Sequence, residues 1–400
     1  MQLIPAQPSD CPTLSRLISL AFATPSDQVQ GWLDNSGLEN FRVLVERPGE
    51  TPMACCLRVP MGHFFGGRSV PVLGIAGVAV APEQRGRGLA TVMMQEALRE
   101  ARAEGTALSS LYPATLPLYR RVGYEQAGYW CEYRLPLSRL RLEKDEPQGG
   151  ERLRVRAYDP EKDRASLTRC YTAFALQHNG MLDRGDYIWG RIFKPRQGET
   201  SGFVVEGGGG QIEGYVFLRQ ERNPDFKHDL HLTDLAASTP AAGRRILDML
   251  SDFRSIGHEL VFHGGPVHPL VTLLDEQKFR LTLREYWMLR IVDVAAALTG
   301  RGYNPHVNAE FTLEVTDSTL PENAGPWRVS VANGKAGVSR GGESARGMVK
   351  LSERSLAAAY SGFMSPQHLR SIGRMEGDEQ GVAAASAVFA AAAPSLQDMF

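Results

Sequence analysis

A short run of alternating arginine and glycine is the part of the chain best suited to chemistry. An apolar segment at 75–81 ends at Pro82, and a helical stretch follows at 91–103. Between them the sequence is Arg85, Gly86, Arg87, Gly88, Leu89 and Ala90. First-turn N–H groups of a helix lack partners within the helix, and the helix dipole adds positive charge there. The run therefore predicts a main-chain anion site; the alternative is a structural turn that binds nothing.

A second motif lies at 117–124, with Tyr119 four residues before Gly123. In this order, the two motifs resemble those of the GNAT superfamily of acyl-CoA-dependent N-acetyltransferases. The family patterns are Q/R-x-x-G-x-G/A after a central strand and Y-x-x-x-G-[FY] on a later helix. The resemblance implies acetyl-CoA as cosubstrate, with its pyrophosphate on the amides of residues 85–90 and its pantetheine along the preceding strand at Val78, Ala79 and Val80.

The composition limits the class of protein that carries these motifs. The chain has 400 residues, 43% apolar and 22% charged, which predicts a globular protein of two or three domains. A net charge of −1 argues against a strong overall field for nucleic acid or a membrane surface, and leaves local charged patches open. No apolar run approaches the ~20 residues of a membrane span, so we expect a cytoplasmic protein. Five scattered cysteines without metal-ligand spacing predict reduced thiols and no metal site.

The first domain is predicted at 1–140. It opens with a strand and a helix within 1–22 that buries Leu14, Leu17, Ile18 and Phe22 on one side. Strands follow at 41–45, 53–59 and 70–80, the last central because residues 75–81 are apolar on both faces. A strand at 108–112, a short helix at 117–122 and a strand at 125–135 complete it.

The polar segment 24–34 forms a wall of the acceptor groove in GNAT folds, which makes Asp27, Trp32 and Asp34 candidates for holding an amine. The alternative is that Trp32 packs and the aspartates cap helices. Glu83 lies in the loop before the anion site and is interpreted as a solvated charge. Tyr124 is interpreted as a packing residue.

A charged linker at 141–151 separates a second α/β pattern at 152–288. Its elements lie at 153–156, 164–175, 183–193, 202–219 and 228–236. The segments 238–250 and 269–279 then follow in the order of the first domain's two motifs, at an offset of roughly 155 residues, and predict an internal repeat. The repeat has one glycine, Gly243, where the first copy has two, and Val271 stands near the place of Tyr119. We therefore expect a degenerate GNAT-like domain without an acyl-CoA site.

A third pattern at 289–400 starts with a predicted helix at 290–298. Strands at 309–315, 327–332, 335–339 and 348–352 come before helices at 352–360, 366–372 and 379–391. This α+β arrangement resembles the sterol-carrier-protein-like domain. Such a domain often holds a lipid, but the alanine-rich last helix is equally suited to filling the space.

Over essentially its whole length the chain resembles the enhanced-intracellular-survival acetyltransferases, which have a GNAT domain, a degenerate repeat and a sterol-carrier-like tail. The fold class expected is thus α/β with an α+β C-terminal domain. The resemblance implies Tyr119 as general acid and the carboxylate of the last residue, Phe400, as general base. It also implies primary-amine acceptors (aminoglycoside-like, polyamine or lysine) and a homo-oligomer, by resemblance a hexamer.

The chemistry requires such groups. A lysine-type amine has a pKa near 10.4, so it must lose a proton, and a carboxylate can take it once attack on the thioester has made the nitrogen acidic. A main-chain N–H near Val78 to Val80 is the expected donor to the carbonyl oxygen. The alternatives are that Tyr119 only packs and that residues 398–400 form a frayed end.

A rival hypothesis from another class is a non-catalytic lipid- or effector-binding protein, whose first domain only senses acetyl-CoA. The intact arginine-glycine loop together with Tyr119 favours the enzyme.

Overall fold

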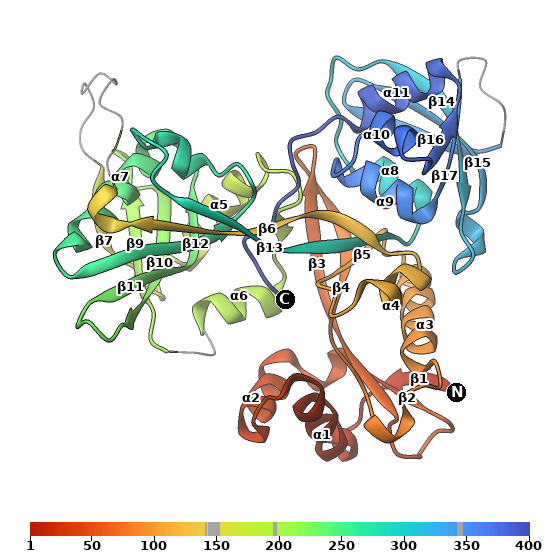
Figure 1. The fold of residues 1–400 in the computed structure, drawn as a ribbon, viewed down its shortest axis with the longest axis horizontal. Helices are drawn as coiled ribbons and strands as arrows, with labels where there is room; N and C mark the ends of the chain where they lie inside the picture. The colour runs from red at the N-terminus through yellow and green to blue at the C-terminus, as the bar shows by residue number, and fades with distance from the viewer. Residues whose placement is uncertain (141, 143–152, 195–197, 342–346) are drawn as a thin grey trace.

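The computed structural model describes residues 1–140, 142, 153–194, 198–341 and 347–400, which form three lobes joined at a central junction (Figure 1). The linker predicted at 141–151 lies outside the described residues except for Leu142. Within the described chain, no helix is both long and apolar enough to cross a membrane. All five cysteines are free, and four of them are buried.

The first unit has the predicted order of elements. They are β1 (Gln2–Pro5), α1 (Cys11–Phe22), α2 (Ser26–Ser36), β2 (Phe41–Val45), β3 (Ala54–Phe65), β4 (Arg68–Val80), α3 (Leu89–Ala103), β5 (Leu108–Leu111), α4 (Leu116–Arg121) and β6 (Glu125–Pro136). Leu14, Leu17 and Ile18 are buried, but the prediction for Phe22 is wrong, since it is 48% exposed. The helix ends at Phe22 and the chain turns at Ala23, which has a positive φ of 51°, so the side chain leaves the packed stripe.

The second unit repeats this plan. Its elements are β7 (Arg154–Ala157), α5 (Arg164–Ala175), β8 (Leu182–Asp183), α6 (Asp186–Phe193), β9 (Ser201–Glu206), β10 (Ile212–Arg222), β11 (His228–Ala237), α7 (Pro240–Ser251), β12 (Gly257–Gly264) and β13 (Arg280–Ile291). The helix predicted at 290–298 is wrong at its start, because Arg290 and Ile291 end β13. The helix there, α8 (Val294–Gly300), begins after Asp293, whose carboxylate caps it by accepting the Ala296 N–H.

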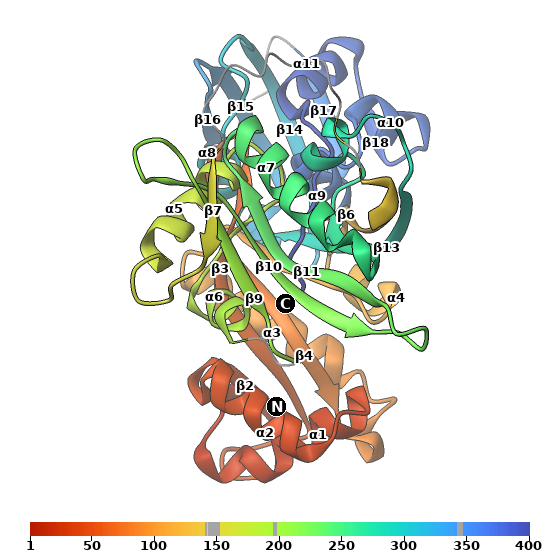
Figure 2. The same ribbon diagram turned by 90° about the vertical axis from the view of Figure 1, so that its left-hand side faces the viewer.

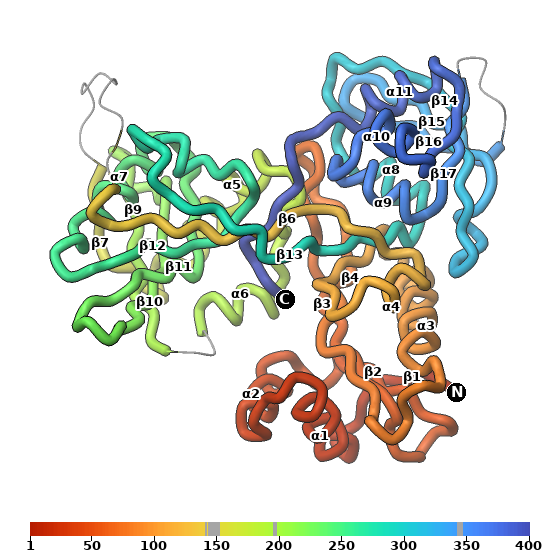
Figure 3. The backbone as a smooth tube through the Cα atoms, viewed as in Figure 1, coloured from red at the N-terminus to blue at the C-terminus, as the bar shows by residue number. Residues whose placement is uncertain are grey.

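The two units share one sheet. Its order is β1-β2-β3-β4-β5-β13-β6-β12-β11-β10-β9-β7, so β13 of the second unit lies between β5 and β6 of the first, and β6 lies between two strands of the second. The backbone trace shows β6 and β13 running side by side across the junction (Figure 3). The units are therefore interleaved rather than joined end to end, and β4 is an interior strand, paired with β3 and β5.

The third lobe is an α+β layer. Its five-stranded sheet, in the order β16-β15-β14-β17-β18, carries helices whose buried side chains pack on it. The elements are β14 (Ala309–Thr316), β15 (Gly325–Ala332), β16 (Lys335–Arg340), β17 (Met348–Ser352), α9 (Glu353–Ser361), α10 (Pro366–Ser371), β18 (Met375–Gly377) and α11 (Glu379–Phe389). Helix α11 buries Val382, Ala385, Val388 and Phe389, so the alanine-rich helix fills space against the sheet. The chain then leaves this lobe and ends at the junction of the other two (Figures 1 and 2).

Candidate active site

The arginine-glycine loop opens onto solvent at the start of α3. Gly86 and Gly88 have φ values of +80° and +74°, in the left-handed region that glycine adopts at little cost, and a Cβ at either position would meet nothing within 4 Å. Gly88 is the N-cap of α3 and supplies no side-chain cap. The first-turn N–H groups thus remain free for an anion, with exposed Arg85 and Arg87 beside them. Leu89 is buried and Ala90 half-buried at the helix start.

Strands β4 and β5 separate just before this loop. They pair in parallel only from Val72 with Leu108 to Gly74 with Ser110. Past that point β4 continues through a bulge at Gly77, where the register with β3 shifts and φ is +58°. Val78, Ala79 and Val80 follow the bulge, on a stretch of β4 that has left its partner on that side. The result is a V-shaped opening with its vertex at Gly74 and Ser110.

Tyr119 approaches this opening from the α3 side of the sheet. It is 4% exposed on α4 and belongs to the same buried cluster as Leu73 and Ile75 of β4. Burial, with a smaller contribution from the Cys56 thiol, raises the pKa of Tyr119 to about 12. Tyr124 packs edge-on against it at 6.1 Å, and its hydroxyl is engaged with Ser109 Oγ at 2.7 Å. The packing interpretation of Tyr124 is confirmed.

The chain's last residue lies at the same opening from the other face. A Cβ at Gly74 would be 3.2 Å from Cε2 of Phe400, so the ring rests on the vertex, and it packs edge-on against Tyr112 at 5.5 Å. Phe400 contacts the cluster that contains Val72 and Ala76, the β4 side chains opposite to those that meet Tyr119. The structure therefore brings the two residues predicted to be catalytic to opposite faces of one strand opening.

The end of the chain is held in place. Leu396 N–H donates to Tyr129 O at 3.1 Å, Tyr112 hydroxyl donates to Asp398 O at 2.7 Å, and Arg191 donates to Met399 O at 2.6 Å. Asp398 is ion-paired with buried Arg184 at 2.9 Å. The frayed-end alternative is contradicted by these contacts.

The structure places one of the three acceptor candidates, Trp32, on β4 and leaves the two aspartates exposed. Trp32 packs on the β4 bulge, where a Cβ at Gly77 would be 2.4 Å from its ring, and donates its indole N–H to the Tyr187 hydroxyl at 2.8 Å. Asp27 and Asp34 lie exposed on α2, with Asp34 accepting from Gln30 at 2.8 Å along the helix. Asp34 is two positions from Trp32, hence on another face of the helix, and neither aspartate is brought to the opening.

Several residues at the opening were not predicted from the sequence. Tyr112 ends the strand predicted at 108–112, so its place next to the second motif could have flagged it. Tyr187, Arg191 and Glu285 come from the second unit. Tyr187 and Arg191 lie on α6, which follows the short strand β8 that pairs with β3, and Glu285 lies on β13. Glu285 pairs with Trp130 on β6, and burial raises its pKa, as burial raises that of Tyr112. Ser110 Oγ, at the vertex, is buried and has no hydrogen-bond partner among the described residues.

The corresponding region of the second unit is closed. Only Ser238 and Thr239 separate β11 from α7, whereas residues 81–88 separate β4 from α3. The prediction that Gly243 belongs to a loop is wrong, because it lies buried within α7. Thr239 Oγ1 accepts the Ala242 N–H at 3.2 Å and donates to the Glu213 carboxylate at 2.9 Å. Val271 lies half-buried in the 3-10 turn Pro269–Leu273.

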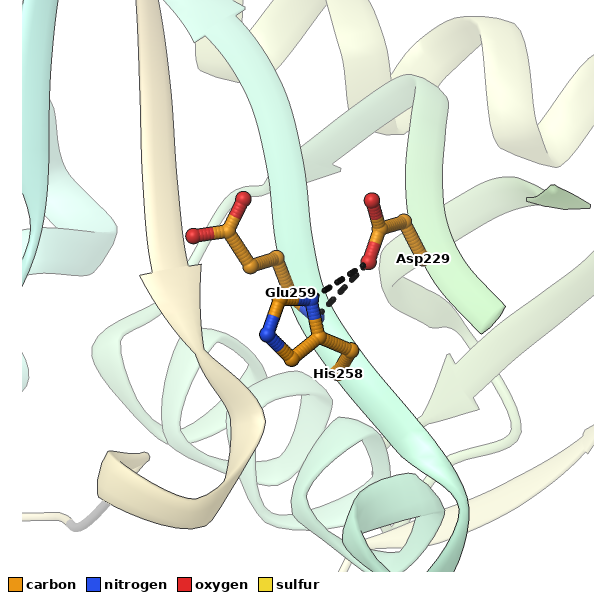
Figure 4. Close-up of side chains that lie close together, drawn as sticks. All are labelled: Asp229, His258 and Glu259. Atoms are coloured by element: carbon orange, nitrogen blue, oxygen red, sulfur yellow. Dashed lines mark hydrogen bonds and ion pairs between the residues drawn. The ribbon is translucent and has the colours of Figure 1, made fainter. Parts of the chain in front are cut away.

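One group of potential metal ligands occurs among the described residues. Asp229, His258 and Glu259 have ligand atoms within 4.8 Å of one another (Figure 4). Asp229 Oδ1 already interacts with His258 Nδ1 at 3.2 Å and accepts the Glu259 N–H at 3.1 Å. The Glu259 carboxylate points away and accepts from Arg134 and Arg280. These contacts account for the cluster by ordinary ion pairing.

Glu83, in the loop before α3, is also paired. It lies 2.9 Å from Arg16, and this contact holds the pKa of Glu83 below its usual value.

Comparison with known proteins agrees with this architecture. Residues 2–127 and 180–291 each match an acetyltransferase (GNAT) domain, and residues 294–397 match the sterol carrier protein domain. An uncharacterized N-acetyltransferase of Streptomyces coelicolor is 31% identical over 380 residues, covering 91% of this chain and 90% of the relative. The N-acetyltransferase Eis of Mycobacterium tuberculosis is 29% identical over 301 residues, covering 72% and 71%.

Solved structures share the whole arrangement. A GCN5-related N-acetyltransferase from Anabaena variabilis has a TM-score of 0.91 at 30% identity, with full coverage of both chains. Eis1 from Mycobacterium abscessus, at 21% identity and a TM-score of 0.79, shares the fold. The fold and the open helix N-terminus define an acetyl-transferring enzyme of the GNAT superfamily. Within it, the chain belongs to the Eis (enhanced-intracellular-survival) type, with two GNAT domains followed by a sterol carrier protein domain.

Proposed function

We propose that the enzyme transfers the acetyl group of acetyl-CoA to a primary amine at a single site in the first unit. The observation that carries this is the place of Phe400 at the vertex of the β4–β5 opening, on the face opposite Tyr119. An acid and a base that flank one opening from two sides suit direct transfer, in which the amine enters from one side and the thiolate leaves on the other.

Acetyl-CoA supplies an activated acetyl group as a thioester. The main-chain N–H groups of residues 85–89 would hold its pyrophosphate, and open space at Gly86 and Gly88 leaves room for close approach. The edge of β4 at Val78 to Val80, free of β5, offers hydrogen bonds to the pantetheine arm. A main-chain N–H on this stretch is also positioned to donate to the carbonyl oxygen.

The two proton transfers fall to Tyr119 and Phe400. Because burial raises the pKa of Tyr119 to about 12, its phenol stays protonated at neutral pH and can donate to the leaving thiolate. The Phe400 carboxylate orients the ammonium of the acceptor and takes its proton as the C–N bond forms. Trp32 and Tyr187, joined by a hydrogen bond at the β4 bulge, would supply an aromatic wall suited to the apolar part of an amine.

Acceptors in this proposal are aminoglycoside-like amines, polyamines or lysine side chains, all of which are cationic. The half-buried Glu285 carboxylate adds a further negative group on β13 toward the same region. A homo-oligomer, hexameric by resemblance, and a cytoplasmic location stay predictions that accompany this assignment.

The test is to extend the chain past Phe400. A few added residues convert the terminal carboxylate into a neutral amide, and kcat/KM on one amine should fall by about two orders of magnitude, the scale of a lost general base. An N-terminal tag of the same composition is the matched control and should leave kcat/KM unchanged, with equal thermal melts. Equal rates for untagged, N-tagged and C-extended enzyme would rule out the carboxylate and move the search for a base to Glu285.

A further inference from the structure

Both units hold the tail that ends in Phe400: the first through Tyr112 and Tyr129, and the second through the side chains of residues 397 and 398. Gln397 Nε2 donates to Asp234 Oδ1 and to Leu235 O, both at 3.0 Å, on β11. Arg184, just after β8, contacts the Asp398 carboxylate through Nη2 at 2.9 Å and Nε at 3.2 Å. The second unit thus holds the tail by hydrogen bonds three residues before the proposed base and by an ion pair two residues before it.

The place where the tail docks corresponds to the strand opening of the first unit. β11 and β12 are the parallel pair of the second unit, and their last paired residues are His231 and Val261. Leu235 lies beyond this point, on the stretch of β11 that corresponds to residues Val78 to Val80 of β4. A cavity of about 450 Å³ lies there, with Asp234 and Val261 in its wall and Gln397, Asp398 and Met399 reaching into it. The second opening therefore holds the chain's own C-terminus.

Arg184 is built to hold one orientation. Its side chain is fully buried, forms a two-pronged pair with Asp234 at 2.7 and 2.9 Å, and lies 3.6 Å from the centroid of the Tyr171 ring. Asp234 also accepts the Tyr215 hydroxyl at 2.7 Å. A guanidinium fixed by a bidentate carboxylate and an aromatic face has little freedom left, so it presents Nε and Nη2 to Asp398 in a single geometry.

We propose that the second GNAT unit is a receptor for the chain's own C-terminus, with Arg184 as a positioning residue that holds Asp398 and thereby the Phe400 carboxylate. This rests on the proposed role of that carboxylate as base. Arg184 does not touch the reacting atoms. It fixes the position of Asp398, from which Met399 and Phe400 extend to the opening. The unit that lost its cosubstrate loop is retained, in this view, because it completes the active site of the other.

The experiment compares full-length wild type with Asp398→Asn, which keeps the side chain's shape but removes its charge. Asp252→Asn, at an exposed position in the same unit, is the matched control. The first readout is the rate at which carboxypeptidase A releases Phe400, which is independent of catalysis. The second is kcat, KM and acetyl-CoA affinity, measured both in the natural chain and in a chain extended past Phe400.

The expected result is that Asp398→Asn releases Phe400 about tenfold faster and lowers kcat about tenfold, while acetyl-CoA affinity and the thermal melt are unchanged. In the extended chain, which already lacks the terminal carboxylate, the same substitution should change kcat by less than about twofold, because a positioning residue acts only through the group it positions. Should Asp398→Asn fail to fold, Arg184→Lys replaces it in every measurement. This substitution keeps the positive charge but removes the guanidinium that makes paired hydrogen bonds.

Two outcomes overturn the inference: unchanged Phe400 release with unchanged kcat, or an equal loss of kcat in natural and extended chains, which marks a merely structural role. If extension alone leaves the natural activity intact, the base assignment fails instead. The carboxypeptidase arm then still decides whether Arg184 and Asp398 anchor the tail, so the two failures are distinguishable.

Discussion

The start of α3 and the start of α7 show how one strand-loop-helix plan leaves the helix start open in one unit and capped in the other. At α3, an exposed loop ends in Gly88, which offers no cap and leaves the first-turn N–H groups unoccupied by side chains. At α7, a two-residue connection places Thr239 as the cap, with the Glu213 carboxylate behind it. An anion would meet an occupied donor and a negative charge there. The proposed anion site therefore depends on the absence of a side-chain cap at Gly88 as well as on the helix.

A charge placed in the open loop should have the largest effect. We expect Gly88→Glu to weaken acetyl-CoA binding by more than about 100-fold, because a side chain at φ +74° strains the turn and a carboxylate repels the pyrophosphate. Ala241→Glu, exposed in the first turn of α7, is the matched change in the second unit and should leave affinity as it was. Calorimetry should give one site per chain for wild type.

Retained binding in Gly88→Glu, or two equal sites in wild type, would contradict the assignment of a single cosubstrate site. A thermal melt of each variant separates lost binding from lost folding.

Removing one hydroxyl should have the next largest effect. Tyr119→Phe keeps the buried ring, so acetyl-CoA affinity should barely change, while kcat falls roughly 10²-fold, the low end for a positioned acid. Since the pKa of Tyr119 is raised to about 12, the phenol remains protonated through the assay range, and wild-type kcat should show no descending limb between pH 8 and 10.

An unchanged kcat in Tyr119→Phe would return this residue to a packing role. A descending limb below pH 10 that disappears in the same variant would mean that Tyr119 titrates far lower than its burial implies.

Local patterns in the sequence predicted the parts of this site but not their assembly. The loop at 85–90, Tyr119 and most strands and helices follow from glycine placement and hydrophobic periodicity, which are local properties. The interleaving of β13 between β5 and β6 depends on pairing between residues far apart in the chain, which periodicity does not contain. Residues 280–284 alternate leucine with arginine and threonine and are exposed, so this half of β13 does not have the continuous apolar run that marks a central strand.

The same limit explains the second unit's contribution. Arg184 and Asp234 look like ordinary surface charges in sequence, yet the structure buries both, packs Arg184 on Tyr171 and brings the tail into contact with each of them. Trp32 could be placed at the acceptor side by resemblance, but not its partner Tyr187, which lies on α6 of the other unit. The same resemblance predicted Asp27 and Asp34 at the acceptor side, but it does not indicate which face of the helix each occupies, and both are exposed on α2.

The smallest expected effect tests whether the closed helix start can be opened. Thr239→Ala removes the cap of α7 and should cost about 1 kcal/mol of stability, seen as a small fall in the melting temperature. Thr239→Ser, which keeps the hydroxyl, should restore it. No second acetyl-CoA site should arise, because the loop is still too short and the Glu213 carboxylate still faces the helix start. A stricter test is to count acetyl-CoA binding events by calorimetry in the double variant Thr239→Ala with Glu213→Gln, which lacks both the cap and the charge. A second binding event in that double variant would show that only the cap and one charge had silenced the site, whereas a single event means that the missing loop decides it.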